Sequence, residues 1–111
     1  MCMELQLLKS WEQGQALLSE DRLLLFYFTQ PNCSVCHGFK PQLENLLPQY
    51  PEWNAWHVDA SQIPEMAGQM QVFTAPAVLA FYQGKELFRF ARFIPVGQLE
   101  ERLEQMKNIG M

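Results

Sequence analysis

The sequence predicts an α/β domain in which a mixed central sheet carries helices on both faces. Three observations support this fold class. Apolar patterns of strand and helix type alternate along most of the chain, as they do in βαβ units. Two short runs, Leu23–Phe28 and Ala77–Tyr82, are apolar at successive positions, which is typical of central strands buried on both faces. A turn-forming segment follows the second run and predicts an antiparallel hairpin.

The first part of the chain predicts a strand, a helix and a second strand. Met3–Leu7 has the length of a short first strand. Ser10, with Gln13 three residues later, has the form of a capping box and opens a helix that ends near Leu18. The first of the two apolar runs then supplies the central strand, and the polar segment after it is a loop.

The middle of the chain predicts a long helix from Cys33, because apolar residues recur there at helical spacing. Pro41 is expected to bend this helix without ending it, since the pattern resumes beyond the proline. Pro48 and Pro51 are expected to end it. The alternating segment Trp53–Asp59 predicts the next strand.

The last part of the chain predicts a short helix, a hairpin and a final helix. Residues 63–70 have helical spacing with a proline in the first turn. The buried strand Ala77–Tyr82 turns at residues 83–85 into a partner strand, Leu87–Phe93. Pro95 starts the last helix, which has an apolar stripe. The predicted order of elements is β-α-β-α-β-α-β-β-α.

The composition predicts one compact domain over residues 1–111. Hydrophobic residues make up 49% of the chain, which is enough for a substantial core. The formal net charge of −4 argues against a nucleic-acid partner. No apolar stretch has the length of a membrane span, and the N-terminus lacks the features of a signal peptide. We therefore expect a cytoplasmic protein that does not associate with membranes.

The cysteines indicate redox chemistry. Three cysteines cannot pair completely, and in a reducing compartment two close cysteines are more often catalytic or metal-binding than structural. Cys33 and Cys36 lie on the first turn of a predicted helix, at a spacing that brings their sulfurs within reach of a disulfide. Free N–H groups and the helix dipole lower the pKa of a thiol at this position. Cys33 is thus a candidate nucleophile and Cys36 its resolving partner, whereas Cys2 is expected to be a bystander.

Other uses of this pair are open at this point. Both cysteines can be core residues without a chemical role. A zinc site needs two further ligands, and the remaining candidates lack the usual spacing: they are Cys2, His37 and His57. Cys33 to His37 also matches the Cys-x-x-Cys-His pattern of c-type haem attachment. Haem requires an axial ligand opposite the histidine, for which the candidates are Met66, Met70 and Met106.

From about Met3 to Met106 the sequence resembles the thioredoxin family. An apolar strand leads into Cys33-Ser34-Val35-Cys36, and Pro41 lies five residues after the second cysteine. The further matching features are Val58-Asp59 with Pro64, Thr74-Ala75-Pro76 before a buried strand, the Gly84 hairpin and Gly97-Gln98-Leu99 in the last helix. The resemblance implies the thioredoxin-like fold and a thiol–disulfide oxidoreductase that acts on protein disulfides in cell redox homeostasis. It requires no metal or organic cofactor.

The resemblance also implies a substrate groove beside the cysteines. In the family, the proline that corresponds to Pro76 follows a cis peptide bond, and the backbone at Ala75 is available to pair with an extended substrate segment. Asn32, Thr74 and Arg92 occupy the other groove positions. Family members have glycine where this chain has Arg92, so that a large cation takes its place.

The sequence departs from the family at the residues that assist the second cysteine. Tyr27 stands in the place of the family's buried acid, and Ala55 in the place of its lysine partner. Neither side chain acts as a base near neutral pH. Asn32 replaces the usual Trp before the first cysteine, and Ser34-Val35 replaces Gly-Pro. The sequence thus retains a nucleophile but not the proton relay of the family.

Two functional hypotheses follow. In the first, Cys33 attacks a substrate disulfide and Cys36 resolves the mixed disulfide; His37 or water relays the proton, or His37 is an ordinary exposed residue. The protein is then a monomer, and a thioredoxin reductase regenerates it when it acts as a reductant. In the second, the chain is a non-catalytic or redox-sensing adaptor domain of the same fold.

Overall fold

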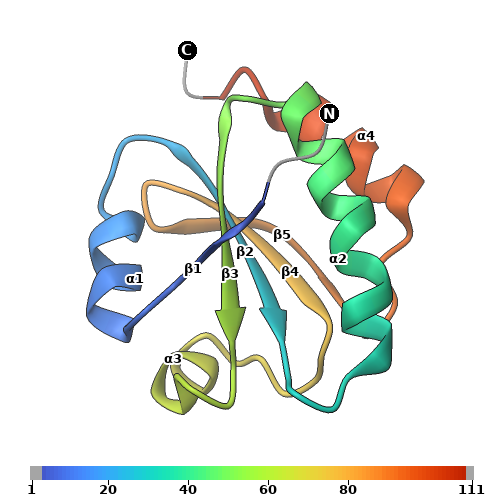
Figure 1. Cartoon of the computed structure of the whole chain (residues 1–111). Helices are drawn as coiled ribbons and strands as arrows, with labels where there is room; N and C mark the ends of the chain where they lie inside the picture. Colours follow the sequence, from blue (N-terminus) through green and yellow to red (C-terminus); the bar gives the residue numbers. More distant parts are fainter. Residues whose placement is uncertain (1–3, 110–111) are drawn as a thin grey trace.

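A computed structural model describes residues 4–109 and contains one five-stranded sheet with the strand order β1-β3-β2-β4-β5 (Figure 1). Strands β1, β3 and β2 run parallel, whereas β4 is antiparallel to both β2 and β5. The sheet is therefore mixed, with helices on both faces, as the sequence predicts. Of the helices in this part of the chain, none combines the length and the apolar character of a membrane span.

The elements follow the predicted order. Their bounds are β1 Gln6–Leu7, α1 Trp11–Leu18, β2 Leu23–Thr29, α2 Ser34–Leu46, a 3-10 turn Leu47–Gln49, β3 Trp53–Asp59, α3 Pro64–Gln69, β4 Ala77–Tyr82, β5 Lys85–Ala91 and α4 Val96–Met106. Helix α1 opens as the capping-box pattern indicates, because the Ser10 hydroxyl accepts a hydrogen bond from the Gln13 N–H at 3.0 Å. Helix α2 continues past Pro41 to Leu46.

Two strands differ from the prediction. The first strand covers only Gln6–Leu7, and Met3 lies outside the described residues. The last strand starts at Lys85 and ends at Ala91, and so lies two residues earlier than predicted. It ends there because Arg92 adopts a left-handed backbone with φ 71°, which β-strand geometry does not allow.

The sheet separates two apolar clusters. Helices α2 and α4 cover one face, and α1 and α3 cover the other (Figure 1). Successive residues of β2 contribute to opposite clusters, with Tyr27 beneath α2 and Phe26 and Phe28 on the α1 and α3 face. All seven residues of β2 are buried, which accounts for the apolar run Leu23–Phe28 that makes up all of the strand except its last residue.

Helix α2 is anchored to the sheet by its buried apolar residues, among them the fully buried Leu43. Replacing Leu43 by alanine is expected to lower the free energy of unfolding by about 2–5 kcal/mol, because it removes buried methyl groups and leaves a cavity. Asn45→Ala, at an exposed position of the same helix, is the matched control and is expected to change it by less than about 0.5 kcal/mol. Urea titration measures both values, and equal effects of the two substitutions would contradict the packing described here.

Candidate redox site

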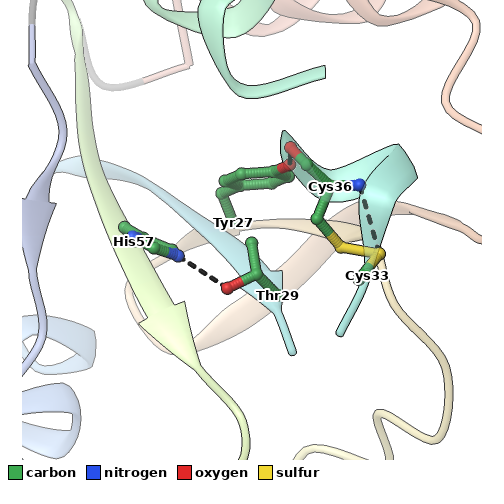
Figure 2. Close-up of a disulfide and its surroundings, with 5 residues drawn as sticks. All are labelled: Tyr27, Thr29, Cys33, Cys36 and His57. Carbon is green, nitrogen blue, oxygen red and sulfur yellow. Dashed lines mark hydrogen bonds between the residues drawn. A yellow bond between two sulfur atoms is a disulfide. The ribbon is translucent and has the colours of Figure 1, made fainter. Parts of the chain in front are cut away.

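The two cysteines lie where the loop after β2 enters α2. Cys33 is the N-cap of the helix, with extended backbone, and Cys36 lies in its first turn. A disulfide joins them across a Cα–Cα distance of 5.2 Å (Figure 2). Cys33 is half-buried, whereas Cys36 is only 1% exposed. The two sulfur atoms therefore differ in their access to an approaching molecule.

The start of α2 favours negative charge on the Cys33 sulfur. The Cys36 N–H donates a hydrogen bond to Cys33 Sγ at 3.1 Å. This N–H is one of the groups at a helix start that lack a partner within the helix, and the positive end of the helix dipole adds to its effect. A thiolate at Cys33 is stabilised by both, as the spacing of the cysteines predicts.

Tyr27 lies beneath the first turn of α2. Its hydroxyl donates a hydrogen bond to the Cys36 carbonyl at 2.7 Å, and its side chain is fully buried (Figure 2). Burial, together with the nearby Glu44 carboxylate, raises the pKa of Tyr27 well above the usual value of a phenol. Tyr27 therefore stays neutral and acts as a hydrogen-bond donor that holds the helix.

A second polar pair lies on the same face of the sheet. The imidazole of His57 and the hydroxyl of Thr29 are 2.7 Å apart (Figure 2). In the parallel register Tyr27 is opposite His57, and Thr29 lies two residues further along β2, so that all three side chains point toward α2. Burial lowers the pKa of His57, as does the positive charge of Lys40, while Asp59 and Glu44 oppose this effect. His57 is therefore neutral at neutral pH.

The sequence pattern did not single out His57 as part of the redox site. It was a zinc-ligand candidate on a predicted strand, and only the strand register places it beside Tyr27 and Thr29. His37 is exposed on the first turn of α2, where its backbone N–H bonds to the Cys33 carbonyl at 3.3 Å. The structure therefore places a different histidine on the buried side of the cysteine pair.

The candidate metal and haem ligands that lie within residues 4–109 do not form a ligand group. Within residues 4–109 no three His, Cys, Asp or Glu side chains are grouped so that they could hold a metal ion. Met66 is fully buried on the α1 and α3 face of the sheet, opposite the helix that carries His37. Met70 packs against that same cluster and Met106 against the other one. Cys2 lies outside the described residues.

An apolar groove of about 480 Å³ lies next to the start of α2. It is lined by Val35, Gly38, Phe39, Gln42, Pro76, Phe93, Ile94, Pro95 and Val96. Pro76 is buried and follows a cis peptide bond, as the family resemblance implies. Of the other predicted groove residues, none lines this groove: Asn32, Thr74, Ala75 and Arg92 lie outside it. Two of the lining residues have large apolar side chains that are exposed: Val35 is 61% exposed and Phe93 is 77% exposed. The sequence pattern does not single out either of them as a groove residue.

Arg92 is held next to Pro76 by its backbone. Its N–H donates to the Pro76 carbonyl at 2.8 Å, and the following N–H, of Phe93, donates to the Ala91 carbonyl at 2.9 Å. With φ 71°, this position favours glycine, yet the chain has an exposed arginine there. The conformation turns the chain out of β5 and brings Phe93 to the groove.

Known proteins are similar to this chain in sequence and in fold. The family model described as Thioredoxin matches residues 5–105. The thioredoxin-like protein YdfQ of Bacillus subtilis (strain 168) is 37% identical over 89 residues, which is 80% of each chain. Thioredoxin from Trypanosoma brucei brucei has a TM-score of 0.83 at 25% identity, with 93% of this chain and 90% of that chain covered. The thioredoxin of Malassezia sympodialis, at 17% identity, has a TM-score of 0.86 over 96% and 95% of the two chains and supports the fold alone.

The chain therefore belongs to the thioredoxin family. Its Cys33–Cys36 pair is joined at disulfide distance on the family's scaffold, and the protein is a thiol–disulfide oxidoreductase. Protein disulfides are the class of substrate that the family implies. These findings confirm the fold and the general function that the sequence predicts.

His57 is expected to make stability depend on pH. The pKa of His57 is lower in the folded chain than the value of 6.5 for a free side chain, so the unfolded chain binds the proton more strongly. The corresponding stability is present above about pH 6.5 and is lost as the pH falls below it. Urea titrations at about pH 7 and pH 5 should show a larger loss for the wild type than for His57→Gln. The exposed His37→Gln control should follow the wild type, and parallel losses in wild type and His57→Gln would contradict the assignment.

Arg92→Gly is expected to raise the free energy of unfolding by about 0.5–1 kcal/mol. Left-handed backbone costs an L-residue roughly 1–2 kcal/mol, and the greater freedom of glycine in the unfolded chain offsets about half of the gain. Arg92→Ala retains a Cβ atom and should give no such gain. Guanidinium denaturation compares the two variants, and an equal gain in both would contradict backbone strain as its cause.

Proposed function

We propose that Cys33 attacks the substrate disulfide and that Cys36 resolves the mixed disulfide. The observation that supports this division is the difference in burial, because Cys33 is half-buried while Cys36 is 1% exposed. A substrate sulfur can approach the first cysteine more readily than the second. The hydrogen bond from the Cys36 N–H to Cys33 Sγ also stabilises a thiolate at Cys33.

The reaction consists of two thiol–disulfide exchanges. The Cys33 thiolate bonds to one substrate sulfur, and the other substrate sulfur leaves as a thiolate. The Cys36 thiolate then bonds to Cys33 Sγ, and the first substrate sulfur leaves. The substrate disulfide gains two electrons in total, and the cysteine pair loses them as it becomes the Cys33–Cys36 disulfide.

We propose that the apolar groove binds the segment of the substrate that flanks the substrate's disulfide. Val35 and Phe93 line it with side chains that are 61% and 77% exposed. The backbone N–H and carbonyl of Ala75 make no hydrogen bond to the rest of residues 4–109, so both are free to pair with an extended segment. The exposed Arg92, beside Pro76, favours segments that carry acidic residues. Asn32 and Thr74 are proposed to contact the flanking substrate backbone.

We further propose that the protein acts as a monomer in the reducing environment of the cytoplasm. The odd number of cysteines supports a reducing compartment, because a full disulfide framework is impossible. A thioredoxin reductase would regenerate the dithiol. A redox-sensing adaptor of the same fold would share the cysteine pair but would not turn over a substrate.

Reduction of insulin disulfides by the protein in the presence of excess dithiothreitol separates these functions. The wild type should accelerate precipitation of the insulin chains, and Cys33→Ser should abolish the acceleration because the attacking sulfur is lost. In a separate incubation without dithiothreitol, Cys36→Ser that has been reduced beforehand should accumulate a covalent adduct with insulin, which mass spectrometry detects and which a reducing agent then releases. Equal inactivity of the wild type and Cys33→Ser would favour the adaptor, and an adduct trapped at Cys36 in Cys33→Ser would contradict the assigned roles.

A further inference from the structure

The Cys36 thiol must lose its proton before its sulfur can attack, and its surroundings restrict where the proton can go. A thiol has an ordinary pKa of about 8.5, so at neutral pH most of it is protonated. Cys36 is only 1% exposed, and the fully buried Tyr27 lies beneath it. Because bulk water has little access to the sulfur, a group on the sheet face below α2 is the natural acceptor.

Most titratable groups near this face are already engaged. The Tyr27 hydroxyl donates its hydrogen to the Cys36 carbonyl, and a phenol is a poor acceptor of a second proton. The Glu44 carboxylate accepts from the Leu5 N–H at 2.9 Å and lies 4.0 Å from Lys40 Nζ. The Asp59 carboxylate accepts from the N–H and the hydroxyl of Ser61 at 3.0 and 2.7 Å.

The His57–Thr29 pair is different. His57 is half-buried, and among the side chains of residues 4–109 its Nε2 has a hydrogen-bond partner only in the Thr29 hydroxyl. Figure 2 shows Thr29 between this imidazole and the Cys33–Cys36 disulfide. Thr29 is 8% exposed. It is the last residue of β2, and it follows a run of buried aliphatic and aromatic residues. A hydroxyl buried at that point both orients the imidazole and extends its reach toward the cysteines.

We propose that His57, oriented by Thr29, accepts the proton of Cys36 during resolution of the mixed disulfide. This inference rests on the proposed roles of the two cysteines. The proton leaves Cys36 Sγ and passes through a bridging water to the Thr29 hydroxyl oxygen, while the hydroxyl gives its own hydrogen to His57 Nε2, 2.7 Å away, which becomes an imidazolium. The Cys36 thiolate attacks Cys33 Sγ, the disulfide within the protein forms, and the substrate leaves as a thiolate. The imidazolium returns its proton to solvent, which His57 reaches through its exposed part.

The charges around His57 suit this cycle. Its lowered pKa keeps the imidazole neutral, and thus able to accept a proton, at neutral pH. The Lys40 ammonium contributes to this effect, as does His37 to a smaller extent. The Asp59 and Glu44 carboxylates act in the opposite direction and stabilise the imidazolium while it exists. Tyr27, the remaining titratable neighbour, stays neutral.

The test follows attack and resolution separately. The reduced protein, in a Cys2→Ser background so that Cys33 and Cys36 are its only thiols, is mixed with a small aryl disulfide that releases a coloured thiolate, in a stopped-flow instrument between about pH 5 and pH 9. The first release reports attack by Cys33, and the second reports resolution by Cys36. In His57→Gln the second release should slow by about 100-fold at neutral pH, as expected for loss of a general base. Its rate should approach that of the wild type at high pH, where hydroxide removes the proton.

Thr29 supplies the matched pair of variants. Thr29→Val removes the hydroxyl at nearly constant shape and should slow the second release, whereas Thr29→Ser keeps the hydroxyl and should restore it. The first release should keep its wild-type rate in His57→Gln and in both Thr29 variants, which shows that the site is intact. A merely structural role of His57 would alter both releases together and would leave the pH profile of their ratio unchanged.

The outcomes distinguish the relay from the proposed function. If no first release occurs in the wild type, or if it survives in Cys33→Ser, the assigned cysteine roles fail. If the first release is normal and the second has the same pH profile in wild type, His57→Gln and Thr29→Val, the relay fails alone. A changed second release in His37→Gln, with His57→Gln like the wild type, would also overturn the proposal.

Discussion

The hydrogen bond from the Tyr27 hydroxyl to the Cys36 carbonyl joins the central strand to the start of α2, and the geometry of the site depends on it. The bond is buried, and without it the Tyr27 hydroxyl would be left without its acceptor away from water, which is costly. The Tyr27 ring, fully buried beneath α2, brings its hydroxyl to the carbonyl. The first turn of α2 is thereby held with Cys36 toward the sheet and Cys33 toward solvent.

The exchange of an acid for a phenol at this position separates two tasks. A carboxylate beneath the cysteines would accept protons, but it would not donate a hydrogen bond to a carbonyl while ionised. Tyr27 makes that bond and gives up the proton chemistry, since burial raises its pKa. The neighbouring His57–Thr29 pair lies on the same sheet face, because His57 is opposite Tyr27 on β3 and Thr29 is two residues after Tyr27 on β2. It offers a basic group while the hydrogen bond from Tyr27 to the Cys36 carbonyl is kept. Structural and acid–base roles thus fall on adjacent side chains of the same sheet face.

Local patterns were sufficient for most of the fold. The N-cap at Ser10, the two-sided apolar strand Leu23–Phe28 and the helix that continues past Pro41 depend on residues close in sequence, and all three are present. For the last strand, local patterns predict an end at Phe93, two residues later than the observed end of β5 at Ala91. Leu87–Phe93 is apolar enough to continue the strand, but the left-handed backbone at Arg92, bonded to the Pro76 carbonyl, ends it. That contact comes from another part of the chain and leaves no local pattern.

The sequence by itself determined the cysteine pair, its place at a helix start and the order of strands and helices, because each of these depends on spacing along the chain. Only the tertiary structure decided which cysteine faces solvent and which histidine shares a face with the pair. His37 is adjacent to Cys36 in sequence yet exposed, whereas His57 is distant in sequence and lies beside Tyr27 through the β2–β3 register. The physical reason is that strand pairing, which is non-local, sets the neighbours of a buried side chain.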